Sequence, residues 1–283
     1  MAKTVVLGAS GYLGGRLIHS LCEETNVDDV LAIGGSTRYM PDLGVSYVTS
    51  EDGPRLLRAL RGEFVTVINC ANHYRSENPN SFSQLKANYL WPLRILDALP
   101  KSCSIHWVEV SSRWALTRSM IENFTLYGFS KVAAISTLRS HCGSRGGDFS
   151  YVIVGDVFGQ RDPRRKLPST VVNLLGTKQT VQVTGGQQVL TPMFVDDVSK
   201  AICGLLMRRQ PVRVMLRADD FTLSHFVRTV NKLLKRKALV LHEGPVLPSA
   251  FGVAEPQLDL ESVWLPSFER TLKDHFLAKG RKA

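Results

Sequence analysis

A tyrosine and a lysine lie four residues apart in the segment LYGFSK, as Tyr127 and Lys131. On a helix this spacing places both side chains on one face. A free phenol ionises only near pH ~10, so it is a poor acid or base at neutral pH. An ammonium ion one helical turn away favours the phenolate, and a phenol so tuned can exchange a proton with a carbonyl or alcohol oxygen. The pair indicates proton transfer at an oxygen, although the same spacing also arises by chance on solvent-exposed helices.

Two serines could assist at the same oxygen. Ser111 and Ser112 end the run SIHWVEVSS, which reads as a buried strand just before the segment with the tyrosine and the lysine. A hydroxyl at a strand end can hydrogen-bond the oxygen that a neighbouring phenol protonates. Both serines are candidates on this ground.

The first strand-to-helix turn of the chain is rich in glycine. VVLGASGYLGG places Gly8, Gly11 and Gly14 three residues apart. In a dinucleotide site the first glycine allows a tight turn, the second lets the backbone approach a pyrophosphate, and the third lets the helix pack closely on the strand. The helix N-terminus then offers free N–H groups to the phosphates. This position in the chain indicates a dinucleotide-binding turn rather than an ordinary glycine loop.

The end of the second predicted strand bears on the choice between NAD and NADP. NAD sites usually carry an acidic residue there for the ribose 2′-hydroxyl. This strand ends LAIGGSTR, with Gly34 near the expected position, followed by Ser36 and Arg38. No carboxylate would repel a 2′-phosphate, and Arg38 could pair with one. The segment favours NADP (NADPH) over NAD, unless Arg38 is only an exposed loop cation.

Strands and helices alternate over the first two-thirds of the chain. The pattern predicts an α/β fold with a doubly wound parallel sheet, and a smaller C-terminal lobe for the substrate. We expect a cofactor domain over 1–160, and a lobe over 161–283 with part of the chain returning to the sheet. The predicted strands are 3–9, 29–35, 64–71, 104–112 and 149–159, and the predicted helices are 14–24, 53–60, 81–99 and 127–142.

Bulk properties narrow the class of protein. The chain has 283 residues, of which 44% are hydrophobic, and no apolar run approaches the length of a membrane span. Five widely spaced cysteines favour reduced thiols over a disulfide framework or a zinc site. We expect a cytoplasmic protein without a membrane partner. The net charge of +10 is spread along the chain, and its cluster over 161–166 suits a phosphorylated ligand.

With these features in this order, the sequence resembles the short-chain dehydrogenase/reductase superfamily. It is most similar to the extended branch of that superfamily, which modifies nucleotide-linked sugars. The segment VTGGQQVLTPMFVDDVSKAI (183–202) is similar to a later part of that branch. The resemblance covers most of the chain and implies a Rossmann-type fold. It also implies a homodimer formed by helices beside the helix with Tyr127 and Lys131.

The resemblance assigns roles position by position. It implies that Tyr127 is the acid/base, that Lys131 binds the nicotinamide ribose, and that Ser112 orients the reacting oxygen, with Ser111 as the second choice. It implies that Asn88 supports the sheet near the cofactor. The remaining implied cofactor contacts are Gly8, Ser10, Gly11, Tyr12, Leu13, Gly14, Cys70 and Ala71.

A nucleotide-sugar substrate carries two phosphates, so the implied site should offer cations and polar groups. The candidates follow the third and fifth predicted strands or open a later helical run. They are His73, Arg75, Arg161, Arg164, Arg165 and Asn173. For each of them an ordinary surface or structural role is an equal alternative.

Two departures from the extended branch refine the predicted activity. The segment between Ser112 and Tyr127 is short, and VGDVFGQRD replaces the usual proline–glycine after the fifth strand. The chain looks most like the CDP-paratose and CDP-abequose synthase group, which implies NADPH-dependent reduction of a nucleotide-linked 4-keto-deoxysugar. Dehydratases of the branch have an acidic pair where Arg113 and Trp114 stand.

Two other functions remain open. One is a nucleotide-sugar epimerase with tightly bound NAD(P), which would show no net cofactor use. The other is a non-catalytic NADP-binding interaction module, supported only by the basic charge. A nucleic acid is not the expected partner, because a binding module has no need of a serine, tyrosine and lysine set.

Overall fold

The computed structural model describes residues 2–35, 43–73, 81–113, 126–164, 166–175, 177–185, 189–208, 210–242 and 260–277. Within these residues, eight parallel strands form one sheet in the order β14-β11-β6-β5-β4-β1-β2-β3. The order reverses between β1 and β4, which is the topological switch point where doubly wound sheets bind ligands. The strands are β1 (Ala2–Leu7), β2 (Val30–Gly34), β3 (Ser46–Thr49), β4 (Phe64–Asn69), β5 (Ser104–Ser112), β6 (Asp148–Val154), β11 (Arg213–Arg217) and β14 (Glu261–Trp264).

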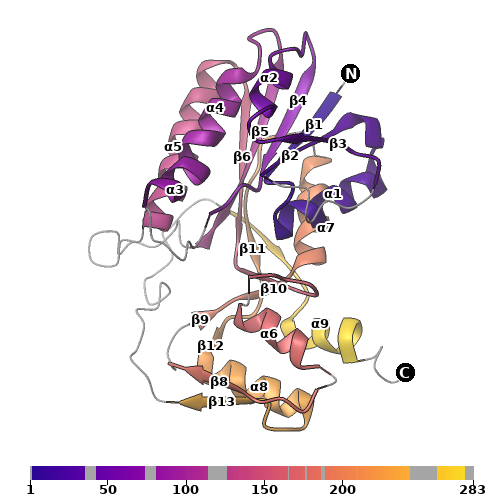
Figure 1. Ribbon diagram of the computed structural model, residues 1–283, viewed down its shortest axis with the longest axis vertical. Coiled ribbons are helices and arrows are strands. Elements are labelled where there is room, and N and C mark those ends of the chain that lie inside the picture. Colours follow the sequence, from indigo (N-terminus) through magenta and orange to yellow (C-terminus); the bar gives the residue numbers. More distant parts are fainter. Residues whose placement is uncertain are drawn as a thin grey trace.

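Helices cover both faces of this sheet (Figure 1). One face carries α1 (Tyr12–Glu24) and α7 (Val195–Leu206), which contact each other. The other carries α2 (Gly53–Leu57), α3 (Ser81–Leu85), α4 (Trp91–Ala98) and α5 (Leu126–Ser144). Because both faces are buried, the central strands are mostly apolar, and each face has its own hydrophobic cluster. The predicted α/β fold with a doubly wound parallel sheet is confirmed.

Three details differ from the sequence prediction. The short strand β3 was not predicted. The predicted helix 81–99 contains a π-helical turn, η2 (Lys86–Leu90), between α3 and α4. The predicted strand 149–159 breaks at Gly155 into β6 and β7 (Asp156–Phe158), because β7 pairs with β10 (Pro192–Phe194) outside the main sheet.

A smaller lobe lies below the sheet in Figure 1. Two further strand pairs, β8 with β13 and β9 with β12, lie in this lobe beside α6, α8 and α9. Aromatic rings from β7, β10, β12, α8 and α9 pack against one another in its core. Its elements are α6 (Leu167–Leu174), β8 (Val181–Thr184), β9 (Val189–Leu190), β12 (Phe221–Thr222), α8 (Leu223–Leu234), β13 (Leu239–His242), α9 (Phe268–Thr271) and η4 (Leu272–Leu277).

Two strands from the C-terminal half of the sequence, β11 and β14, also belong to the main sheet. β11 pairs with β6 and β14 pairs with β11, so the sheet is completed from both halves of the sequence. No helix in the described part of the chain is long and apolar enough to cross a membrane.

Candidate functional site

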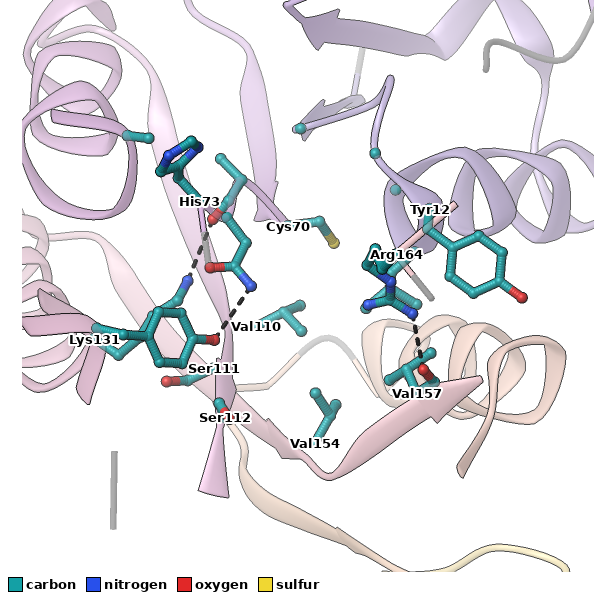
Figure 2. A pocket seen from close by; sticks show the side chains of 18 of the residues that line it. Tyr12, Cys70, His73, Val110, Ser111, Ser112, Lys131, Val154, Val157 and Arg164 are labelled. Carbon is teal, nitrogen blue, oxygen red and sulfur yellow. Dashed lines mark hydrogen bonds between the residues drawn. The ribbon is translucent and has the colours of Figure 1, made fainter. Parts of the chain in front are cut away.

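A cavity of about 870 Å³ opens at the carboxyl ends of β1, β4, β5 and β6. This is the edge of the sheet beside the switch point. The glycine turn after β1 lines one side of the cavity, and the residues that follow β4 and β5 line the other (Figure 2). The topology therefore brings the predicted cofactor turn and the predicted catalytic residues to one enclosure.

The glycine turn fits the close approach that its sequence predicts. Gly8 has a positive φ of 73°, and a Cβ there would lie 2.6 Å from the backbone nitrogen of Ala71. A Cβ on Gly14 would lie 2.3 Å from the carbonyl oxygen of Gly8. α1 starts at Tyr12 with no side-chain cap and no acidic residue in its first turn. Its first N–H groups and its positive dipole end are therefore open to an anion.

Tyr127 and Lys131 lie side by side on α5 and both are buried, at 7% and 1% exposure. The Tyr127 hydroxyl accepts a hydrogen bond from Asn72 Nδ2 at 3.2 Å, and Lys131 Nζ donates to the Ala71 carbonyl at 3.2 Å (Figure 2). Both side chains line the cavity. Ala71 and Asn72, which follow β4, therefore hold the ammonium and the phenol in place.

Ser111 and Ser112 both line the cavity at the end of β5. Ser111 is 2% exposed, and its hydroxyl has no hydrogen-bond partner among the described residues. Strand alternation places Ser111 on the face of β5 that also carries Trp107 and Glu109 and that α5 covers. Ser112 follows on the opposite face. The geometry brings both predicted serines to the site.

Asn88 connects the segment after β4 to α5. It is fully buried in the π-helical turn η2. Its Oδ1 accepts from the His73 backbone N–H at 2.6 Å, and its Nδ2 donates to the His73 carbonyl and to Ser130 on α5. One side chain thus ties the segment after β4 to the helix of the Tyr–Lys pair. His73 itself lines the cavity, and its Nε2 is buried without a partner among the described residues.

A cationic side faces the glycine turn. Arg164 and Lys166 line the cavity from the loop after β7, and the Arg164 guanidinium lies 4.8 Å from the centre of the Tyr12 ring. Arg164 is held by the buried carboxylate of Asp162, with Nε at 2.7 Å from Oδ1. Burial lowers the pKa of Lys166, and Asp156 at 4.0 Å opposes that effect. This side offers positive charge to an anionic ligand.

Arg113 occupies the position after Ser112 and is 9% exposed. Its guanidinium donates to the carboxylate of Asp220 at 2.5 Å and also to the hydroxyl of Thr191. The end of β5 is therefore tied to the lobe by a cation that lines the cavity wall.

The predicted residues divide into three groups. The predicted residues that line the cavity are Gly8, Ser10, Gly11, Tyr12, Leu13, Gly14, Cys70, Ala71, His73, Ser111, Ser112, Tyr127, Lys131 and Arg164, and Asn88 lies behind its wall. Arg161 and Asn173 are exposed and do not line it. Ser36, Arg38, Arg75 and Arg165 lie outside the described residues.

Asn72, Asp156 and Glu109 are among the residues of the site that the sequence did not reveal. Asn72 binds the phenol, Asp156 lines the cavity, and Glu109 lies behind Lys131. Lys166, which also lines the cavity, belongs to the basic cluster 161–166. A carboxylate inside the apolar run SIHWVEV was the available signal for Glu109, because an unpaired charge is not stable in a buried strand. The described residues contain no group of three or more His, Cys, Asp or Glu side chains that could hold a metal ion.

Comparison with known proteins agrees with this fold. The curated relative CDP-abequose synthase from Yersinia pseudotuberculosis is 23% identical over 213 residues, which cover 71% of each chain. Among solved structures, UDP-glucose 4-epimerase from Thermus thermophilus in complex with NAD superposes with a TM-score of 0.70 at 18% identity, covering 97% of this chain and 93% of that one. ADP-L-glycero-D-manno-heptose-6-epimerase from Helicobacter pylori gives 0.73 at 14% identity, covering 98% and 95%.

At these identities the solved structures establish the fold alone. The family assignment comes from the sequence, because the profile of one family matches residues 4–214, from β1 into β11. That span includes the glycine turn, both serines, the Tyr–Lys pair and the cationic loop. The chain belongs to the NAD dependent epimerase/dehydratase family, a group of extended short-chain dehydrogenases/reductases.

Proposed function

We propose that this protein is an NADPH-dependent reductase of a nucleotide-linked 4-keto-deoxysugar. The observation that carries the proposal is the placement of a buried phenol and a buried ammonium opposite a glycine turn in one cavity. The similarity to CDP-abequose synthase supports a sugar linked to a nucleotide. Arg113, held by Asp220, stands where the dehydratases of the branch carry an acid, which favours reduction over dehydration.

The residues present fit a nicotinamide dinucleotide. The space against Gly8 and Gly14 is too small for any side chain, and the open start of α1 suits a pyrophosphate. The glycine turn, Cys70 and Ala71 would hold the adenosine and phosphate part, and Lys131 would hold the nicotinamide ribose. When bound, NADPH supplies a hydride to the substrate carbon.

The protein's own contribution is proton transfer and orientation. Tyr127 donates its phenolic proton to the carbonyl oxygen of the substrate, and Ser112 or Ser111 hydrogen-bonds the same oxygen. Lys131 favours the resulting phenolate through its positive charge. Asn72 fixes the phenol by its 3.2 Å hydrogen bond, so that the proton is delivered from one direction.

The preference for NADPH rests on the end of β2. A Cβ at Gly34 would lie 2.8 Å from the backbone nitrogen of Ser10, so no acidic side chain fits at this position. The proposed partner of the 2′-phosphate, Arg38, lies outside the described residues. Dissociation constants of the Arg38→Glu variant for NADPH and NADH test this point. We expect the ratio to move toward NADH, and an unchanged ratio would remove Arg38 from the proposal.

Replacement of Tyr127 by Phe tests the reaction. Nucleotide-4-keto-sugars generated in situ are screened for NADPH oxidation. We expect Tyr127→Phe to lower kcat by about 10²–10⁴-fold, because only the proton donor is lost. NADPH affinity should remain close to that of the unmodified protein. Tyr89→Phe is the matched control, because the Tyr89 hydroxyl contacts Thr137 and does not line the cavity.

The screen also separates the alternatives. Interconversion of two nucleotide sugars without net NADPH use would assign an epimerase. Full function of Tyr127→Phe would assign a non-catalytic NADP-binding module. Oxidation of NADPH that depends on Tyr127 supports the reductase.

We further propose that the chain forms a homodimer through the helices beside α5. Phe82 on α3, Leu90 on η2 and Phe129 on α5 are 60%, 43% and 41% exposed. Large apolar side chains that are exposed close together are typical of a protein–protein interface. Light scattering of the Phe129→Lys variant should show a monomer. A dimer of unchanged stability in this variant would place the interface elsewhere.

A further inference from the structure

A glutamate lies buried behind the cavity wall. Glu109, in the middle of β5, is fully buried and does not line the cavity. Its Oε2 accepts hydrogen bonds from Asn69 Nδ2 at 2.7 Å and from Trp107 Nε1 at 3.2 Å. Its Oε1 accepts none from the described residues, and it lies 3.8 Å from Lys131 Nζ. One oxygen is thus fixed by the sheet, and the other faces the ammonium.

The strand itself directs Glu109 toward this lysine. Side chains alternate along β5, so Trp107, Glu109 and Ser111 share the face that α5 covers. Val108 points to the opposite face, into the other hydrophobic cluster. Lys131 reaches the same face from α5 and also binds the Ala71 carbonyl. The carboxylate therefore approaches the ammonium from behind, on the side away from the cavity.

A lysine as buried as Lys131 needs a compensating charge to stay an ammonium. Transfer of an isolated ammonium out of water is unfavourable by several kcal/mol, and proteins avoid it by pairing the charge or losing the proton. Glu109 is the acidic group that acts on Lys131 at this distance. Burial raises the pKa of Glu109, whereas Lys131 and the N–H groups of Asn69 and Trp107 lower it.

A thiol next to this pair is neutral. Cys70 lies at the end of β4, and burial raises the pKa of its thiol to about 12. It therefore contributes no charge at neutral pH. Among the described groups that act on Cys70, Glu109 and Lys131 carry the charges, because burial also raises the pKa of the third group, Cys203, to about 12.

We propose that Glu109 is a positioning residue for the Tyr127–Lys131 pair, whose free oxygen keeps Lys131 charged and in place. The ammonium then has one N–H on Ala71, one toward Glu109 and one left for the cavity. The inference rests on the proposed function only where it concerns proton transfer by Tyr127. The coupling between Glu109 and Lys131 stands without it.

The Glu109→Gln variant tests the coupling. Glutamine keeps the volume and an oxygen acceptor for Asn69 and Trp107 but removes the charge. Two opposite charges 3.8 Å apart and out of water stabilise each other's charged form. We expect the deprotonation midpoint of Lys131 to fall when the carboxylate is removed. NMR of lysine labelled with ¹³C at Cε measures it, with Lys131→Met assigning the signal.

Two controls separate charge from packing. Val108→Ala loosens the same strand without a change of charge, so it should lower stability and leave the Lys131 midpoint unchanged. Glu109→Asp restores the charge at a longer distance, so it should recover at least half of the shift. An unchanged Lys131 midpoint in a folded Glu109→Gln variant would overturn the proposal.

A reciprocal measurement covers the case in which Glu109→Gln does not fold. Coupling between two sites acts equally in both directions. Lys131→Met should therefore raise the titration midpoint of the Glu109 carboxyl, measured by ¹³C NMR of labelled glutamate. No change of this midpoint would overturn the proposal in the same way.

Kinetics connect the coupling to the reaction. In Glu109→Gln the alkaline limb of the kcat/KM profile for NADPH oxidation should move to lower pH, in step with Lys131. A Lys131 shift in a protein that reduces no keto-sugar would refute the proposed function but keep the coupling. Reduction of a keto-sugar with no change in the Lys131 midpoint would keep the proposed function and refute the coupling.

Discussion

Gly14→Ala probes how tightly the glycine turn is built. The new Cβ would lie 2.3 Å from the Gly8 carbonyl oxygen, whereas real Cβ atoms stay beyond 3.0 Å, so the turn must move by about 0.7 Å. Overpacking of this kind destabilises by about 1–3 kcal/mol, and alanine's helix propensity offsets about 1 kcal/mol of it. We expect a net loss of up to about 2 kcal/mol and a Tm lower by up to roughly 4 °C.

The same displacement should weaken cofactor binding. The Gly8 carbonyl accepts from the Gly11 N–H at 2.9 Å, so a shift of Gly8 moves the backbone that would face the phosphates. Loss of one hydrogen bond to a charged group corresponds to about 1.5–3 kcal/mol, or at least a tenfold higher Kd for NADPH. Thermal unfolding and fluorescence titration with NADPH measure the two effects.

Gly204→Ala is the matched control for this variant. Gly204 is an exposed residue of α7, and its Cβ would have no heavy atom within 4 Å. Alanine there should stabilise the protein by about 0.5–1 kcal/mol and leave NADPH binding unchanged. A Gly14→Ala protein that melts at or above the wild-type Tm and binds NADPH equally well would refute the packing argument.

Three further predictions concern the serines and the pH dependence of stability. Of Ser111→Ala and Ser112→Ala, the variant that loses about tenfold or more of kcat identifies the hydroxyl at the reacting oxygen, and equal small losses would exclude both. Burial lowers the pKa of His106, so its share of the stability is present above about pH 6.5 and is lost as pH falls; His106→Gln should flatten urea-measured stability between about pH 7 and 5. Burial opposes ionisation of Asp162, but hydrogen bonds from Arg164 outweigh it and lower the pKa, so this stability is present above about pH 4 and lost below. Asp162→Asn should therefore cost about 1–3 kcal/mol at neutral pH and little in acid, and an equal cost at both would contradict the assignment.

Strands were predictable where the burial pattern was strongest. β1, β4 and β5 are mostly apolar because the sheet is covered on both faces, and such runs are visible without any structure. β3 escaped because its four residues lie at the sheet edge and are half exposed, which leaves almost no hydrophobic signal. The turn at η2 escaped because an inserted π-helical turn keeps the composition of an ordinary helix.

The candidate site was predictable where chain order determines position. The carboxyl ends of parallel strands meet at one edge, so the glycine turn, the residues after β4 and the serines after β5 had to converge. The loop after β7 is different. There Arg161 adopts a left-handed backbone with φ of 58° and does not line the cavity, while Arg164 is turned onto Asp162 and lines it. Arg161 and Arg164 have identical chemistry and could not be ranked without that backbone.

Pairs that are distant in sequence were also invisible. Glu109 alone reads as a carboxylate without a visible partner in an apolar run, and Lys131 alone reads as the lysine of the YxxxK pattern. Their 3.8 Å approach depends on how α5 crosses β5. Only the folded chain shows that the charge of one needs the charge of the other.

The completion of the main sheet by β11 and β14, which come late in the sequence, has a practical consequence for the design of shortened variants. We take 1–160 as the cofactor half and 161–283 as mainly the substrate lobe, but a fragment that ends at 160 would carry only β1 to β6 of the main sheet. β6 would then become a bare edge, with open N–H and C=O groups that invite aggregation. The fragment would also lose α7, which covers α1. Expression trials should therefore keep both halves on one polypeptide, or supply the second half in trans during refolding.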